Sequence, residues 1–182
     1  MHNGMVSDFR LIKKKLINFL DDEVLHLVQG TTDSEYCFVL FLQVLFNLKG
    51  IKSHEVQIDG KIADEEFSTA IMQEAMEQTI KQLNQWISES ENANQKSSLM
   101  NFCVTDGRTV VATRYSNYKQ PAASLFYSSG TEFKKVNKNM YIMEQSDRRQ
   151  ICHIISSEPL TDDPDDWVEV ILINFWTSIA PF

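Results

Sequence analysis

The sequence predicts an α+β fold in which helices come first and an antiparallel sheet follows. Up to residue 89 the apolar residues recur at three- and four-residue steps, which is typical of amphipathic and buried helices. From residue 99 onwards, short β-branched and aromatic runs alternate with turn residues, which is typical of strands. Residues 88–98 are polar and of low complexity. We expect them to form a surface loop that joins two layers of one domain.

The first helix is expected to begin at Ser7 or Asp8, because either side chain can act as an N-cap. After this helix we expect either a break or a second short helix that extends to Val28 and ends at Gly30. The apolar stripe of the first helix consists of Phe9, Ile12, Leu16, Phe19 and Leu20.

A buried helix is expected next. Thr32 and Glu35 have the spacing of a capping box, so a helix starts there. The sequence is apolar on every side up to Phe46, which predicts burial all round, and Gly50 is a suitable C-cap. Residues 51–62 are expected to form a loop, and residues 63–89 a long amphipathic helix.

The strands follow as an antiparallel meander. Asp106-Gly107 is a strong hairpin signal between strands at 100–105 and 108–115. The last residues, 171–182, carry no charge, so they form either a buried strand or an exposed apolar tail that is too short to span a bilayer. Further strands are expected at 123–129, 140–145 and 151–157, with turns at Gly130 and Asn137–Asn139.

Composition excludes several classes of protein. Asp and Glu outnumber Lys and Arg by 25 to 17, for a net charge of −8, which argues against binding of nucleic acid. The start of the chain has no signal-peptide pattern, and no stretch is long enough to cross a membrane. Three cysteines form an odd and sparse set, so a reducing compartment, the cytoplasm, is expected.

Few motifs in this chain carry chemistry by themselves. Asn3-Gly4 is either a turn or a source of two oxyanion donors, the Asn3 amide and the Gly4 backbone N–H. Asp33 either interacts with the dipole of its helix or holds the ammonium group of a ligand. Cys152 and His153 are adjacent in a strand and point to opposite faces, so neither a Cys–His dyad nor a metal site is expected. No cofactor-binding signature is present in the sequence.

Four strings, in order along the chain, resemble class II glutamine amidotransferases, which are N-terminal nucleophile hydrolases. The strings are MHNGMVSDFRLIKKKLINFL, VQGTTDSEYCFVLFL, LMNFCVTDGRTVVATRY and IISSEPLTDDPDDW. The nearest likeness is to the fungal glutathione-degradation subunit, a cytosolic partner of a metallopeptidase-like protein. The resemblance covers residues 1–170 and implies part of a four-layer αββα fold, with antiparallel sheets and helices on the outer faces.

The resemblance also implies an activity, the hydrolysis of glutamine or γ-glutamyl amide bonds in glutathione catabolism, without a cofactor. It places Asn3 and the Gly4 N–H in the oxyanion hole, and Asp33 at the α-ammonium group of the substrate. The family's nucleophile is an N-terminal cysteine whose own α-amino group serves as the general base.

The chain departs from this family at both ends. It starts at the family's internal MHNG, and Cys37, Cys103 and Cys152 do not match the nucleophile position. We therefore expect residues 1–170 to be the C-terminal portion of a glutamine amidotransferase type-2 domain, inactive alone, and residues 171–182 to be an apolar tail outside the family. The alternative is a non-catalytic binding or scaffold subunit that keeps half of the substrate pocket.

Overall fold

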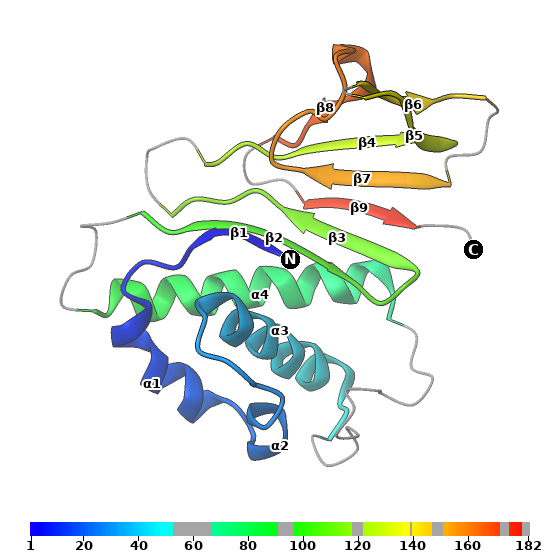
Figure 1. The fold of residues 1–182 in the computed structure, drawn as a ribbon. Coiled ribbons are helices and arrows are strands. Elements are labelled where there is room, and N and C mark those ends of the chain that lie inside the picture. The colour runs from blue at the N-terminus through cyan, green and yellow to red at the C-terminus, as the bar shows by residue number, and fades with distance from the viewer. Residues whose placement is uncertain are drawn as a thin grey trace.

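The structure is a computed structural model that describes residues 1–52, 67–90, 97–117, 122–138, 140–146, 151–171 and 175–179. The chain builds a helical layer, a four-stranded sheet and a second group of strands, stacked in that order (Figure 1). The class is therefore α+β, as predicted. No helix in the described ranges is long and apolar enough to cross a membrane.

Four α-helices of the described residues make up the first layer: α4 lies directly against the first sheet, and α3 packs against α4 and reaches β1 (Figure 1). Thr32 caps α3, because its hydroxyl accepts a hydrogen bond from the Glu35 N–H, and Gly50 ends the helix at a φ of 70°. Both ends were predicted from the sequence. The helices are α1 (Phe9–Phe19), α2 (Asp22–Leu25), α3 (Asp33–Lys49) and α4 (Thr69–Ser88).

The first sheet is antiparallel and has the strand order β1-β2-β3-β9. The predicted hairpin at Asp106-Gly107 joins β2 to β3, and Gly107 takes a positive φ of 94° there. The strand β9 lies within the uncharged C-terminal residues and pairs with β3. The four strands are β1 (His2–Met5), β2 (Leu99–Thr105), β3 (Thr109–Thr113) and β9 (Phe175–Ile179).

The second group of strands covers the other face of the first sheet. One sheet has the order β7-β4-β8, and β5 pairs with β6 in a separate ribbon. All pairs are antiparallel, but β8 and β9 return to earlier strands, so the strands do not form the single meander that was expected. The strands are β4 (Phe126–Gly130), β5 (Glu132–Asn137), β6 (Met140–Glu144), β7 (Cys152–Ser156) and β8 (Val168–Glu169).

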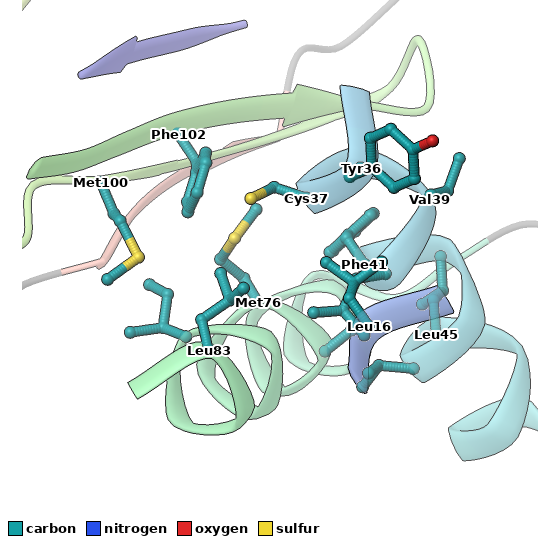
Figure 2. Packing of buried hydrophobic residues seen from close by; sticks show 14 of the residues in the cluster. Leu16, Tyr36, Cys37, Val39, Phe41, Leu45, Met76, Leu83, Met100 and Phe102 are labelled. Carbon is teal, nitrogen blue, oxygen red and sulfur yellow. The ribbon is translucent and has the colours of Figure 1, made fainter. Parts of the chain in front are cut away.

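The main core lies between the helices and the first sheet (Figure 2). Leu16, Leu40 and Leu83 from three helices are fully buried, and Met100 and Phe102 of β2 belong to the same cluster. Burying a side chain of this size stabilises the fold by roughly 1.5–3 kcal/mol before the loss of conformational entropy is counted. Alternate residues of β2 point to the second group of strands instead, so this strand is covered on both faces.

Arg114 connects the first sheet to the second. Its side chain is only 11% exposed and donates hydrogen bonds to the carbonyl oxygens of Ala123 (2.9 Å) and Val170 (2.7 Å). It also pairs with Glu169 of β8 at 2.8 Å. One guanidinium group therefore links the residue after β3, the segment before β4 and the end of β8.

Several local predictions were wrong. Asp8 occupies the N-cap position of α1 but makes no side-chain cap, and Ser7 bonds to Ser98 instead. Phe38 is 49% exposed, so α3 is not buried all round. The long helix begins at Thr69, where Ser68 caps it, and residues 63–66 of the predicted helix lie outside the described residues. The expected loop at 51–62 lies mostly outside the described residues.

Candidate functional site

The residues around Asn3 form an edge strand, although Asn-Gly taken alone suggested a turn. Among the described strands, β1 pairs with β2 alone, and Met1 and Cys103 exchange two backbone hydrogen bonds of 2.7 and 2.9 Å. Hydrogen-bonded and non-hydrogen-bonded pairs alternate along an antiparallel ladder. Asn3 therefore faces Asn101 in a bonded pair, and Gly4 faces Met100 in a non-bonded pair. It follows that the Gly4 N–H points away from β2, to the open edge.

Gly4 is required at its position by the close approach of the β2 backbone. Its φ is 153°, and a Cβ atom built on it would lie 1.9 Å from the carbonyl oxygen of Leu99. No side chain fits at that distance. The absence of a side chain also leaves the Gly4 N–H sterically unhindered, as an oxyanion donor requires.

Asp33 lies at the same edge of the sheet. It is the first residue of α3, and its Oδ2 accepts a 2.9 Å hydrogen bond from the Val6 N–H. Its Oδ1 accepts a second bond, of 2.8 Å, from the Ser34 N–H. Val6 is two residues beyond Gly4, so both N–H groups point the same way and are about 7 Å apart along the strand. The donor and the carboxylate thus have a separation comparable with the length of an extended glutamyl group.

His2 fixes the position of β1 against the helical layer. Its Nε2 lies 3.1 Å from the Leu99 carbonyl oxygen, and its Nδ1 lies 2.9 Å from Ser34 Oγ. A carbonyl can only accept, so Nε2 carries the proton, and in the neutral ring Nδ1 accepts from the Ser34 hydroxyl. The ring also packs against Phe102, with centroids 4.6 Å apart. His2 and Ser34 therefore join the strand that carries Asn3 to the helix that carries Asp33.

Two hollows adjoin this edge. One, of about 530 Å³, is open and is lined by Asp33, by Val6 and by the exposed Arg10. The other, of about 290 Å³, lies on the helical side and is mostly apolar, with His2 and Ser34 among its lining residues. Asp33 therefore lies in the wall of an open hollow, whose lining also includes the cationic side chain of Arg10. Asn3 and Gly4 line neither hollow and lie on the exposed edge itself.

Two of the three cysteines lie near this edge, because Cys37 lines the apolar hollow together with His2 and Ser34, and Cys103 pairs with Met1 beside β1. Cys37 is 2% exposed within α3, and its burial raises the pKa of its thiol well above the usual range, with the negative charge of Asp33 as a second cause. Burial likewise raises the pKa of Cys103, although the N-terminal ammonium group opposes this rise. Cys152 is half-buried in β7. A buried thiol with a raised pKa is a poor nucleophile, because the thiolate is the reactive form.

The fold is similar to that of a solved structure. The chain is similar to the structure of a glutamine aminotransferase class-II domain protein from Silicibacter pomeroyi, with a TM-score of 0.62 and 23% identity. The similarity covers 97% of this chain and 61% of that one. Because identity is this low, the likeness shows the fold alone. It agrees with the predicted part of a glutamine amidotransferase class II fold.

Comparison of the sequence with known proteins finds a relative. The chain is 41% identical over 173 residues to the probable glutamine amidotransferase DUG3 of Saccharomyces cerevisiae. The match covers 93% of this chain and 46% of the yeast protein, so the chain spans less than half the length of that relative. No protein-family model matches the chain. The resemblance to class II glutamine amidotransferases is confirmed in sequence as well as in fold.

The structure brings the three predicted site residues to one edge, with Asn3 and Gly4 on β1 and Asp33 at the start of α3. It adds His2 and Ser34, which sequence reasoning missed. Each is the immediate neighbour of a predicted residue. No sequence signal indicated that their side chains would meet across 32 positions.

Proposed function

We propose that this chain supplies the oxyanion donors and the ammonium-binding carboxylate of a class II glutamine amidotransferase site. The reaction is hydrolysis of the side-chain amide of glutamine, or of a γ-glutamyl bond. Asn3 Nδ2 and the Gly4 N–H stabilise the oxyanion of the tetrahedral intermediate, and Asp33 binds the α-ammonium group. Residues 1–170 are the part of the chain that belongs to this domain.

One observation carries the proposal. The Gly4 N–H points to the open edge of β1, and the Asp33 carboxylate lies at the same edge two residues further along. A glutamyl group laid along this edge places its amide carbonyl at Gly4 and its ammonium group at Asp33. An oxyanion donor in such a position is worth about 2.7–4 kcal/mol of transition-state stabilisation.

Binding of L-glutamine to the ¹⁵N-labelled chain tests the proposal without requiring catalysis. At millimolar glutamine, the backbone amide signals of Gly4 and Val6 are expected to shift in a saturable way. Glutaramic acid, which lacks the α-ammonium group, is expected to cause smaller shifts at the same concentration. Asp33→Asn is expected to abolish the difference between the two ligands, because the carboxylate that pairs with the ammonium group is gone.

Asp162→Asn is the matched control, since Asp162 is an exposed carboxylate in a loop away from β1. It should leave the glutamine response unchanged. Shifts that are equal for both ligands, or that survive Asp33→Asn, would contradict the assignment of Asp33.

The wider setting is also a proposal, supported by the similarity to DUG3. The substrate pathway is glutathione catabolism, the protein partner is a metallopeptidase-like protein, and the location is the cytoplasm. The second candidate function is a non-catalytic binding or scaffold subunit. It is favoured by the placement of the described cysteines, because Cys37 lies in the core with a raised pKa. Hydrolysis by a longer protein that joins an upstream Met-Cys segment to this chain separates the two, because a scaffold remains inactive.

A further inference from the structure

Asn101 lies directly beside Asn3, across the β1–β2 ladder. The two residues are Cα partners in the sheet, so their side chains point to the same face. The preceding pair, His2 and Phe102, faces the helices, since the two rings are in contact and Phe102 belongs to the helical core. Asn3 and Asn101 therefore both face the second group of strands.

The side chain of Asn101 is fully buried and is held in one orientation. Its Nδ2 donates to the carbonyl oxygens of Ala123, at 3.0 Å, and Ser124, at 3.2 Å. Carbonyl oxygens only accept, so the amide cannot turn round without losing both bonds. The position of Oδ1 is thereby fixed, and this buried oxygen has no hydrogen-bond partner among the residues that the structure describes. Asn3 is exposed, and its side chain makes no hydrogen bond with the described residues.

A buried acceptor without a partner is unfavourable and requires an explanation. We propose that Asn101 is a positioning residue of the oxyanion hole. Its Oδ1 accepts a hydrogen bond from the side-chain amide of Asn3 and so determines which end of that amide faces the reacting carbonyl. Rotation about the side-chain torsions of Asn3 brings the two groups together, with no change in the backbone register.

This inference rests on the proposed function and adds to it the residue that orients Asn3. The Asn3 amide carries two N–H donors on one atom and an acceptor oxygen on the other. With one N–H donated to Asn101, the second N–H remains for the oxyanion. Turned the other way, Asn3 would present its carbonyl oxygen to a developing negative charge and would oppose the reaction. The Ala123 and Ser124 carbonyls thus fix the orientation of the Asn101 amide, and Asn101 in turn fixes the orientation of the Asn3 amide.

Hydrogen exchange of the Asn3 side-chain amide tests the inference in the chain as it stands. The two proton signals of Asn3 are identified by their loss in Asn3→Ala. One of the two is expected to exchange with water about fivefold more slowly than the amide protons of the exposed Asn18, the factor that a net hydrogen bond of ordinary strength gives. If both Asn3 protons exchange as fast as those of Asn18, the inference is overturned.

Two variants of Asn101 extend the test. Asn101→Leu is expected to remove the slow exchange, whereas Asn101→Asp keeps an acceptor oxygen and should retain it. Asn84→Leu is the control, because Asn84 also has a buried Oδ1 without a partner in the described part of the chain. It donates to Tyr115 from α4, away from Asn3. Slow exchange that persists in Asn101→Leu would overturn the inference. If the Leu variant does not fold, the Asp variant still decides, because loss of slow exchange in a folded Asp variant would also overturn it.

A further test measures kcat and KM in a longer, active protein that contains this chain. Asn101→Leu should lower kcat about tenfold or more with KM within a factor of two, since orientation of an oxyanion donor acts on the transition state. Equal changes in kcat for Asn101→Leu and Asn84→Leu would overturn the positioning role. The exchange measurement needs no substrate, so its failure is distinct from failure of glutamine binding.

Discussion

Val6 donates its backbone N–H to Asp33 Oδ2 over 2.9 Å, which joins the residue after β1 to the first residue of α3. The same carboxylate faces the edge along which we place the substrate. Asp33 therefore both holds the end of β1 and supplies the charge of the proposed site. Changes at this residue should affect stability and binding together.

Asp33→Asn should destabilise the chain by about 1.5–3 kcal/mol, the range for hydrogen bonds to a charged group. The variant replaces a carboxylate that accepts from Val6 and Ser34 with an amide that has one acceptor oxygen. Urea unfolding followed by circular dichroism measures the loss. Asp162→Asn should be neutral, and equal stabilities for the two variants would contradict the structural role of Asp33.

Gly4→Ala should be more destabilising than a glycine substitution at a helix end. Its Cβ would lie 1.9 Å from the Leu99 carbonyl oxygen, so β1 must move away from β2. Gly50→Ala is the control, because Gly50 has a positive φ of 70° with open space around it, and it should cost about 1 kcal/mol. Thermal unfolding of both variants gives the comparison, and a smaller effect at Gly4 would refute the close approach.

Arg114→Met should lower stability by about 3 kcal/mol or more. It leaves the carbonyl oxygens of Ala123 and Val170 without their donor at a position where the Arg114 side chain is 11% exposed. Lys15→Met removes an exposed ion pair with Glu89 and should produce no measurable change. If both variants unfold at the same urea concentration as the wild type, Arg114 does not connect the sheets.

Stability should fall as the pH rises above about 8.5, the usual pKa of a cysteine thiol. Burial raises the pKa of Cys37 in the folded state, so above that pH the unfolded chain releases a proton that the folded chain keeps. The protonated thiol contributes its full stabilisation of the fold below the pKa that it has in the unfolded chain. This contribution is lost as the pH rises toward the pKa in the folded chain, at up to about 1.4 kcal/mol per pH unit. Cys103, whose pKa is also raised, acts in the same direction.

Urea unfolding between pH 7 and pH 10 measures this slope. Cys37→Ala should reduce the slope even though it lowers stability at pH 7 by creating a small cavity. Cys152→Ala, at a half-buried position in β7, provides the comparison. A slope that Cys37→Ala leaves untouched would show that this thiol ionises in the folded state.

Residues 1–182 alone should release no measurable ammonia or glutamate from glutamine or γ-glutamyl substrates. Cys37 lies in the core with a raised pKa, and Cys103 and Cys152 lie within strands, so neither carries a free α-amino group of its own. The comparison is with a triple Cys→Ala variant at positions 37, 103 and 152. Turnover that the triple variant loses would refute the prediction. Restoring an upstream Met-Cys segment should restore turnover, and Asn3→Ala should then reduce it.

Much of the fold was predictable where the signal is local. The capping of α3 by Thr32, its end at Gly50 and the hairpin at Asp106-Gly107 follow from residues that are neighbours in sequence. The strand at His2–Met5 was not predictable from its own residues. It exists because β2, almost a hundred residues later, pairs with it and leaves no room for a side chain at Gly4. The strand β8, with two residues, is likewise fixed by β4 and not by its own propensity.

The sequence by itself determined the class α+β, the helical ends of α3 and, through resemblance, the identities of Asn3, Gly4 and Asp33 as site candidates. These depend on hydrogen bonds within a few residues and on recognisable strings. Only the tertiary structure decided that the Gly4 N–H points to an open edge, that Asp33 lies two residues further along it, and that Asn101 is buried beside Asn3. The reason is physical: strand pairing sets the direction of each N–H, and its register is fixed by contacts between segments far apart in the chain.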